Sequence, residues 1–204
     1  MKSDQQQYID YIMRFAESCK CHIWLGGSFL HSTASAFSDV DISVFCNAEN
    51  LDKLIYGYGR PVYISYTHNP LGILIIIYED GVAVDMEIIE NIDTADGTYF
   101  HAEDIKAYHY IRNESMCKDL SLKSDMPYQM ARLFHRSLIK FLAGKKDIGV
   151  SVAYEIAAFL HTDSIIDETN YKSEITDLLK SFDEQYQLPL GYYRVLCGLI
   201  EKLD

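Results

Sequence analysis

Two aspartates, Asp39 and Asp41, follow a Gly-Ser pair and open an apolar segment that alternates over 40–45. The alternation predicts a strand, and because alternate side chains of a strand share a face, both carboxylates project from one side. Two anionic oxygen ligands side by side suit Mg²⁺, which binds one or two carboxylates together with substrate phosphates. Upstream, Gly27 lets the backbone approach a phosphate, and the Ser28 hydroxyl can donate to its oxygens. The grouping predicts metal-assisted chemistry on a phosphate substrate.

A third carboxylate follows in a second alternating segment, 82–89. Its apolar residues face one side, and Asp85 and Glu87 face the other. If this strand pairs with the first, Asp85 lies beside Asp39 and Asp41 and completes a triad for two metal ions and in-line phosphoryl transfer. Glu87 shares the face of Asp85, so it is the alternative third acid.

The two motifs Gly27-Ser28 and Asp39-Val40-Asp41 together resemble the signature of the nucleotidyltransferase superfamily of the DNA polymerase β type. The resemblance covers about residues 22–90. It implies that the glycine and serine hold nucleotide phosphates, that the aspartate pair binds magnesium, and that a later strand supplies a third acid, here Asp85.

Within that superfamily, the size and helical tail of this chain are most similar to the aminoglycoside and lincosamide nucleotidyltransferases, which are enzymes of antibiotic resistance. Those enzymes carry a glutamate general base on the first helix of the tail. The corresponding segment here, 128–143, contains no acid. His135 in that segment and Glu155 on the next predicted helix are the two candidates for the base.

Basic residues gather between 123 and 146, where six Lys or Arg stand with one acid. Arg132, Arg136 and Lys140 are four apart, so they line one face of a predicted helix. We expect Arg136 and Lys140 to bind the nucleotide by neutralising its phosphates. The alternative is that these charges form only a solvated helix face.

The elements that position these residues are typical of a mixed α/β layer structure. The first part of the chain is predicted to hold three helices, over about 4–19, 29–36 and 49–56, and five strands, over 22–25, 40–45, 62–67, 73–78 and 82–90. Near residue 95 strand-like alternation gives way to helical periodicity, which predicts helices over about 130–142, 150–161, 171–182 and 190–203.

The expected fold is therefore α/β (α+β) in two domains. Residues 1–95 form the catalytic domain, and the resemblance implies that its mixed sheet and helices have the nucleotidyltransferase arrangement. Residues 96–204 form a C-terminal helical bundle for substrate binding and dimerisation.

The amino-acid composition restricts the classes of binding partner that we expect. The 204 residues include 30 acids and 18 Lys or Arg, a net charge of −12. A protein that follows a nucleic-acid backbone usually carries a basic surface, so this balance argues against nucleic acid and favours a small, cationic ligand. The five cysteines have no zinc or disulfide-framework spacing and predict free thiols in a reducing compartment. Neither a signal-peptide core nor a membrane-length apolar run occurs, so we expect a cytoplasmic protein with no membrane partner.

We expect a Mg²⁺-dependent nucleotidyltransferase that moves a nucleoside monophosphate from an NTP, ATP in the first instance, to a hydroxyl of a small molecule such as an aminoglycoside or lincosamide. The alternatives are transfer to a protein or an RNA end, and nucleotide binding without catalysis. We also expect a twofold homodimer with the helical part at or near the interface. Four apolar residues near the C-terminus either supply that contact or pack inside their own bundle: Leu190, Val195, Leu196 and Leu199.

Overall fold

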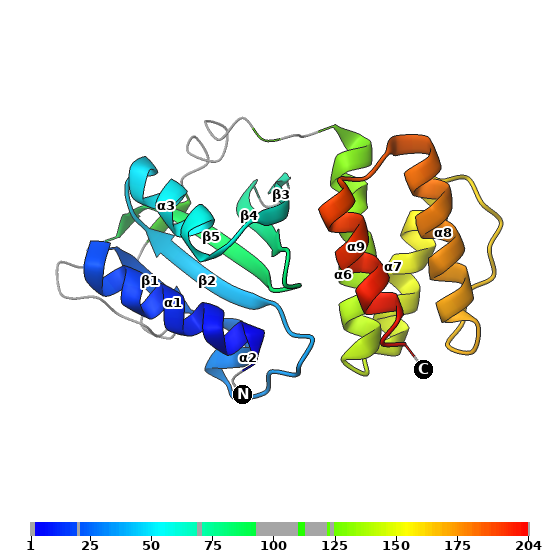
Figure 1. Ribbon diagram of the computed structural model, residues 1–204, viewed down its shortest axis with the longest axis horizontal. Helices are drawn as coiled ribbons and strands as arrows, with labels where there is room; N and C mark the ends of the chain where they lie inside the picture. The colour runs from blue at the N-terminus through cyan, green and yellow to red at the C-terminus, as the bar shows by residue number, and fades with distance from the viewer. Residues whose placement is uncertain are drawn as a thin grey trace. The chain divides into compact units, whose positions relative to one another are not determined.

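The computed structural model describes residues 3–19, 21–68, 71–92, 110–112, 122 and 125–203. The chain divides into two compact units, 1–122 and 123–204 (Figure 1). The boundary expected after residue 95 lies outside the described residues.

The first unit is built around a mixed sheet with the strand order β1-β2-β5-β4-β3 (Figure 1). These strands are β1 (His22–Leu25), β2 (Val40–Phe45), β3 (Pro61–His68), β4 (Leu71–Tyr78) and β5 (Ala83–Ile92). β2 and β5 are parallel, and the other neighbours in this order are antiparallel. A further short strand, β6 (Tyr110–Arg112), pairs with the far end of β5. The expected α+β class, with a mixed sheet and a helical C-terminal part, is confirmed.

Two helices, α1 (Asp4–Cys19) and α3 (Ala48–Tyr58), pack on one face of this sheet (Figure 1). Val40, Ile42 and Val44 of β2 are buried in the core that these helices cover. Because strand residues alternate, Asp41 and Ser43 face the other side of the sheet. The sheet therefore has an apolar, helix-covered face and a second face that carries carboxylates.

Side-chain caps begin both helices, as their sequences predict. Ser3 Oγ accepts a hydrogen bond from the Gln6 amide at 3.2 Å, and Asn47 Oδ1 accepts one from the Asn50 amide at 2.8 Å. The Gln6 side chain donates to Asp10 Oδ1 at 3.1 Å. Ser3 and Gln6 have the spacing of a capping box, and the hydrogen bond to Ser3 Oγ is its serine half.

The helix expected over 29–36 is wrong in both length and position. α2 spans only Gly27–Leu30, and Ser32 beyond it adopts a left-handed φ of 54°. The Thr33 amide donates to the Ser28 carbonyl at 2.9 Å, which closes the chain into a turn. Serine and threonine side chains compete with helical hydrogen bonding, and the sequence after Leu30 is rich in them.

Four helices make the second unit: α6 (Met126–Leu142), α7 (Lys146–Phe159), α8 (Tyr171–Tyr186) and α9 (Leu190–Ile200). α6 and α7 approach closely at Gly149, where a Cβ would lie 2.8 Å from Phe141 Cβ. Ser137 Oγ on α6 donates to the Gly149 carbonyl at 2.7 Å and shares a 2.7 Å hydrogen bond with the Tyr171 hydroxyl. One buried serine thus links α6 to both α7 and α8.

None of the helices described here is long and apolar enough to cross a membrane. On α9, Leu196 and Leu199 are buried within the chain itself. Leu190 is 64% exposed and Val195 is half-buried. Of the four residues considered for a dimer contact, two therefore pack inside their own unit.

Candidate active site

The turn after β1 is shaped by a glycine that touches a carboxylate. Gly27 has a φ of +58°, in the left-handed region where residues with a Cβ are strained. A Cβ at this position would lie 1.8 Å from Asp41 Oδ2 and 2.6 Å from Asp41 Cγ. The preceding amide, that of Gly26, donates to the Asp41 carbonyl at 2.8 Å. Residue 27 must be glycine both for its backbone conformation and for the space that Asp41 occupies.

Asp41 has a second acid beside it on the neighbouring strand. In the parallel pairing of β2 and β5, Asp41 and Asp85 are direct partners, and both are partly exposed. Neighbouring strands are about 4.8 Å apart, and directly paired residues point to the same face. Like charges at such a position repel, so the pair favours a divalent cation between them.

Glu87, the alternative third acid, lies one position further along the same face. Its strand partner is Ser43, whose Oγ donates to Glu87 Oε2 at 3.3 Å. The strand register thus brings Asp85, rather than Glu87, level with Asp41. Asp39 immediately precedes β2 and is half-buried.

Ser28, which follows Gly27 in the turn, offers an unused donor. Its Oγ is buried, and no hydrogen-bond partner for it exists among the described residues. Leaving a buried hydroxyl unsatisfied costs about 1–3 kcal/mol, so the group is suited to a ligand that supplies an acceptor. A phosphate oxygen is such an acceptor, and Ser28 directly follows the Gly27 backbone.

The fit of these residues to a magnesium ion can be tested on the donor set. No three His, Cys, Asp or Glu side chains in the described part of the chain are grouped so that they could hold a metal by themselves. Mg²⁺ does not require such a cage, because it is commonly bound by one or two carboxylates and completed by waters and substrate phosphates. The Asp41–Asp85 pair, next to the Gly27 turn, is compatible with that second mode.

The carboxylate face contains two buried polar side chains that the sequence analysis did not assign to the site. Trp24 pairs with Ser43 and is fully buried, with its Nε1 lacking a hydrogen-bond partner among the described residues. Ser65 pairs with Ile75, the partner of Asp85, and its Oγ is also buried and unsatisfied there. In the sequence, Ser65 could be singled out only as a polar residue within β3, a stretch in which polar and apolar residues alternate.

Four of the expected site residues belong to the other unit, 123–204. Arg136 is exposed and Lys140 half-buried on α6, and Glu155 is exposed on α7. His135, a candidate for the base, is only 4% exposed and lies among the core residues of α6. A buried imidazole is poorly placed to exchange protons with solvent, so Glu155 is the accessible candidate of the two. The roles of all four stay predictions.

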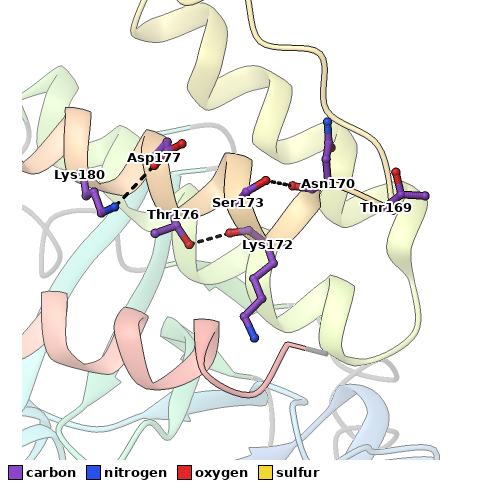
Figure 2. Close-up of a pocket in the computed structure, with 7 residues that line it drawn as sticks. All are labelled: Thr169, Asn170, Lys172, Ser173, Thr176, Asp177 and Lys180. Atoms are coloured by element: carbon purple, nitrogen blue, oxygen red, sulfur yellow. Dashed lines mark hydrogen bonds and ion pairs between the residues drawn. The ribbon is translucent and has the colours of Figure 1, made fainter.

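A shallow depression of about 550 Å³ lies on α8 and contains none of the predicted site residues (Figure 2). Its polar groups are satisfied locally. Thr176 Oγ1 donates to the Lys172 carbonyl at 2.6 Å, Ser173 Oγ donates to the Asn170 carbonyl at 2.9 Å, and Lys180 Nζ lies 3.6 Å from Asp177 Oδ1 (Figure 2). The depression therefore lacks the unsatisfied donors that distinguish the Gly27–Asp41 region.

No protein-family model matches this chain, and no curated protein matches it significantly. A functional proposal therefore depends on the residues and their geometry.

Proposed function

We propose that the chain is a magnesium-dependent nucleotidyltransferase that transfers a nucleoside monophosphate from an NTP to a hydroxyl of a small molecule. The observation that carries the proposal is the contact of the Gly27 backbone with the Asp41 carboxylate, which is itself in strand register with Asp85. A phosphate-binding turn and a carboxylate pair for a cation are the two parts that phosphoryl transfer requires.

In this proposal Asp41 and Asp85 would hold the magnesium together with water and substrate phosphates, and Asp39 stays a predicted further ligand. When bound, Mg²⁺ neutralises phosphate charge and lowers the pKa of the acceptor hydroxyl. Ser28 Oγ donates to a phosphate oxygen, and the Gly27 turn lets the backbone approach the same group. The acceptor hydroxyl loses its proton to water and its oxygen attacks the α-phosphorus in line, while the bond from that phosphorus to the oxygen bridging to the β-phosphate breaks and pyrophosphate leaves.

The acceptor is proposed to be small, hydroxylated and cationic. The net charge of −12 supports a cationic ligand, and aminoglycosides and lincosamides are the first acceptors to test. ATP is the first donor to test.

The test is a turnover assay with α-labelled NTPs, Mg²⁺ and a panel of aminoglycosides and lincosamides, which follows label transfer and pyrophosphate release. We expect Asp41→Asn and Asp85→Asn each to lower turnover by about 100-fold or more, the scale of losing one electrostatic contact to a transition state. Asp52→Asn, an exposed acid on α3, is the matched control and should keep full activity. Unchanged turnover in Asp41→Asn would overturn the proposal.

Two further outcomes separate the alternatives. Label that appears in a protein or RNA band of a lysate would move the acceptor from a small molecule to a macromolecule. Binding of NTP without pyrophosphate release, under every acceptor condition, would make the chain a nucleotide-binding module.

A further inference from the structure

Two cysteines face each other on the helix-covered side of the sheet, opposite the carboxylates. The antiparallel ladder of β1 and β2 pairs His22 with Phe45, so Cys21 and Cys46 continue it by one position. Cys21 is part of the buried core, and Cys46 packs against that core. Both are free thiols.

The hydrogen-bond pattern of this ladder identifies the kind of pair that they form. The Gly26 amide donates to the Asp41 carbonyl, so that pair is a hydrogen-bonded one. Pairs alternate along an antiparallel ladder, and Cys21 is five positions from Gly26, which makes Cys21 and Cys46 a non-hydrogen-bonded pair. The Cα atoms of such pairs are about 4.5 Å apart, within the range of about 4.4–6.8 Å found in disulfides.

The side chains agree with the backbone. Each of the two thiols shifts the pKa of the other, as neighbouring groups do, and the Cys21 thiol donates a hydrogen bond to the Cys19 carbonyl at 3.8 Å. Cys19, the third thiol nearby, is half-buried at the end of α1, where its sulfur lies 3.6 Å from Ser18 Oγ.

We propose that Cys21 and Cys46 form an intramolecular disulfide when the folded chain meets a low-molecular-weight disulfide such as oxidised glutathione. The half-buried Cys46 loses its proton and attacks one sulfur of the oxidant, which forms a mixed disulfide and releases one thiol. Cys21 then loses its proton and displaces the second thiol. Two protein sulfurs are oxidised, and the two sulfurs of the oxidant are reduced.

The bond closes a covalent ring of chain from residue 21 to residue 46. This ring contains the Gly27 turn and both Asp39 and Asp41. The inference depends only on the β1–β2 ladder, so it stands independently of the proposed transferase activity.

The test uses the peptide map of the full-length folded protein. Trypsin cleaves after Arg14, Lys20 and Lys53, so Cys21 and Cys46 leave in one peptide, 21–53, whereas Cys19 leaves in 15–20. The folded protein is incubated with oxidised glutathione, alkylated, unfolded and digested without reductant. We expect an unalkylated 21–53 peptide about 2 Da lighter than the reduced peptide, the mass of the two hydrogens lost. Dithiothreitol should restore the reduced mass.

Two variants serve as controls. Cys19→Ser should keep the mass change in peptide 21–53, and Cys46→Ser should abolish it. The peptide map of the unmodified chain decides whether the disulfide forms. The test therefore does not depend on a variant that folds poorly. The inference is overturned if 21–53 stays alkylated on both cysteines while Cys19 takes up glutathione, or if 21–53 is found cross-linked to 15–20.

Discussion

The backbone of Gly27 and the carboxylate of Asp41 are in such close contact that a Cβ on residue 27 would fall 1.8 Å from Asp41 Oδ2. The turn and the acid are therefore one unit, since neither can move without displacing the other. Gly26 strengthens this link through its amide, which donates to the Asp41 carbonyl.

Gly27→Ala should damage both the fold and the site. A left-handed φ costs an alanine about 1–2 kcal/mol, and the new methyl must also push the Asp41 carboxylate aside. Gly81→Ala is the matched control, because Gly81 has a φ of +88° with nothing within 4 Å of its Cβ position. Urea unfolding should show a larger loss of stability for Gly27→Ala than for Gly81→Ala. Equal losses, with nucleotide binding retained in both, would contradict the contact described here.

Ser28→Ala should weaken ligand binding without destabilising the free protein. The Ser28 hydroxyl has no partner to lose among the described residues, whereas Ser137 bonds to the Gly149 carbonyl and the Tyr171 hydroxyl. We therefore expect Ser137→Ala to lower the free energy of unfolding by about 1–3 kcal/mol, whereas Ser28→Ala should not lower it, because it removes a buried hydroxyl that has no partner. Calorimetry with Mg-NTP should show affinity reduced about three- to tenfold in Ser28→Ala, the equivalent of one hydrogen bond. An affinity equal to that of the parent chain would remove Ser28 from the phosphate site.

Asp85→Asn and Glu87→Gln distinguish the two candidate third acids. A ligand at 100 times its Kd raises the free energy of unfolding by about 2.7 kcal/mol, which a thermal shift with Mg-NTP can detect. The shift should be lost in Asp85→Asn, because this acid is level with Asp41, and kept in Glu87→Gln, because Glu87 pairs with Ser43. The reverse result would assign the third acid to Glu87.

Alkylation of Cys46 should depend steeply on pH. Burial, with a smaller contribution from the neighbouring Cys21 thiol, raises the pKa of Cys46 to about 12. A raised pKa keeps the thiol protonated, and only the thiolate reacts, so the rate with iodoacetamide should increase about tenfold per pH unit from pH 7 to 10. Mass spectrometry of peptide 21–53, with fragment ions that locate the label, measures this rate. A plateau near pH 9 would indicate an ordinary, solvent-accessible thiol.

Much of the sheet could be predicted from the sequence, because β2 alternates between buried and partly exposed residues and β4 is a continuous apolar run. The strand over Val40–Phe45 is predicted with its observed bounds, and the strands predicted over 73–78 and 82–90 correspond to β4 and β5. The expected neighbourhood of Asp41 and Asp85 is confirmed at the level of strand register. Whether these acids bind metal stays a prediction.

Where the structure differs from the expectation based on sequence, the causes are local. α2 is short because hydroxyl side chains after Leu30 favour turns over helix. His135 is buried because it is four residues from Ala131 and one from Phe134, on the apolar stripe of α6. That spacing was visible in the sequence. The close approach of Gly27 to Asp41 could not be predicted from the sequence, because it joins residues from two separate elements.

The parallel pairing of β2 with β5 also determines when in folding the two acids meet. β3, β4 and β5 follow one another as antiparallel neighbours, so they can assemble from short-range contacts. β2 joins β5 across a much longer stretch of chain, and Ser43 and Glu87, which bond across this pair, are 44 residues apart. Closing so long a loop is entropically slow, and parallel pairing has no hairpin to guide it. Asp41 and Asp85 come together only when β2 pairs with β5, so the proposed site depends on a non-local pairing of the sheet.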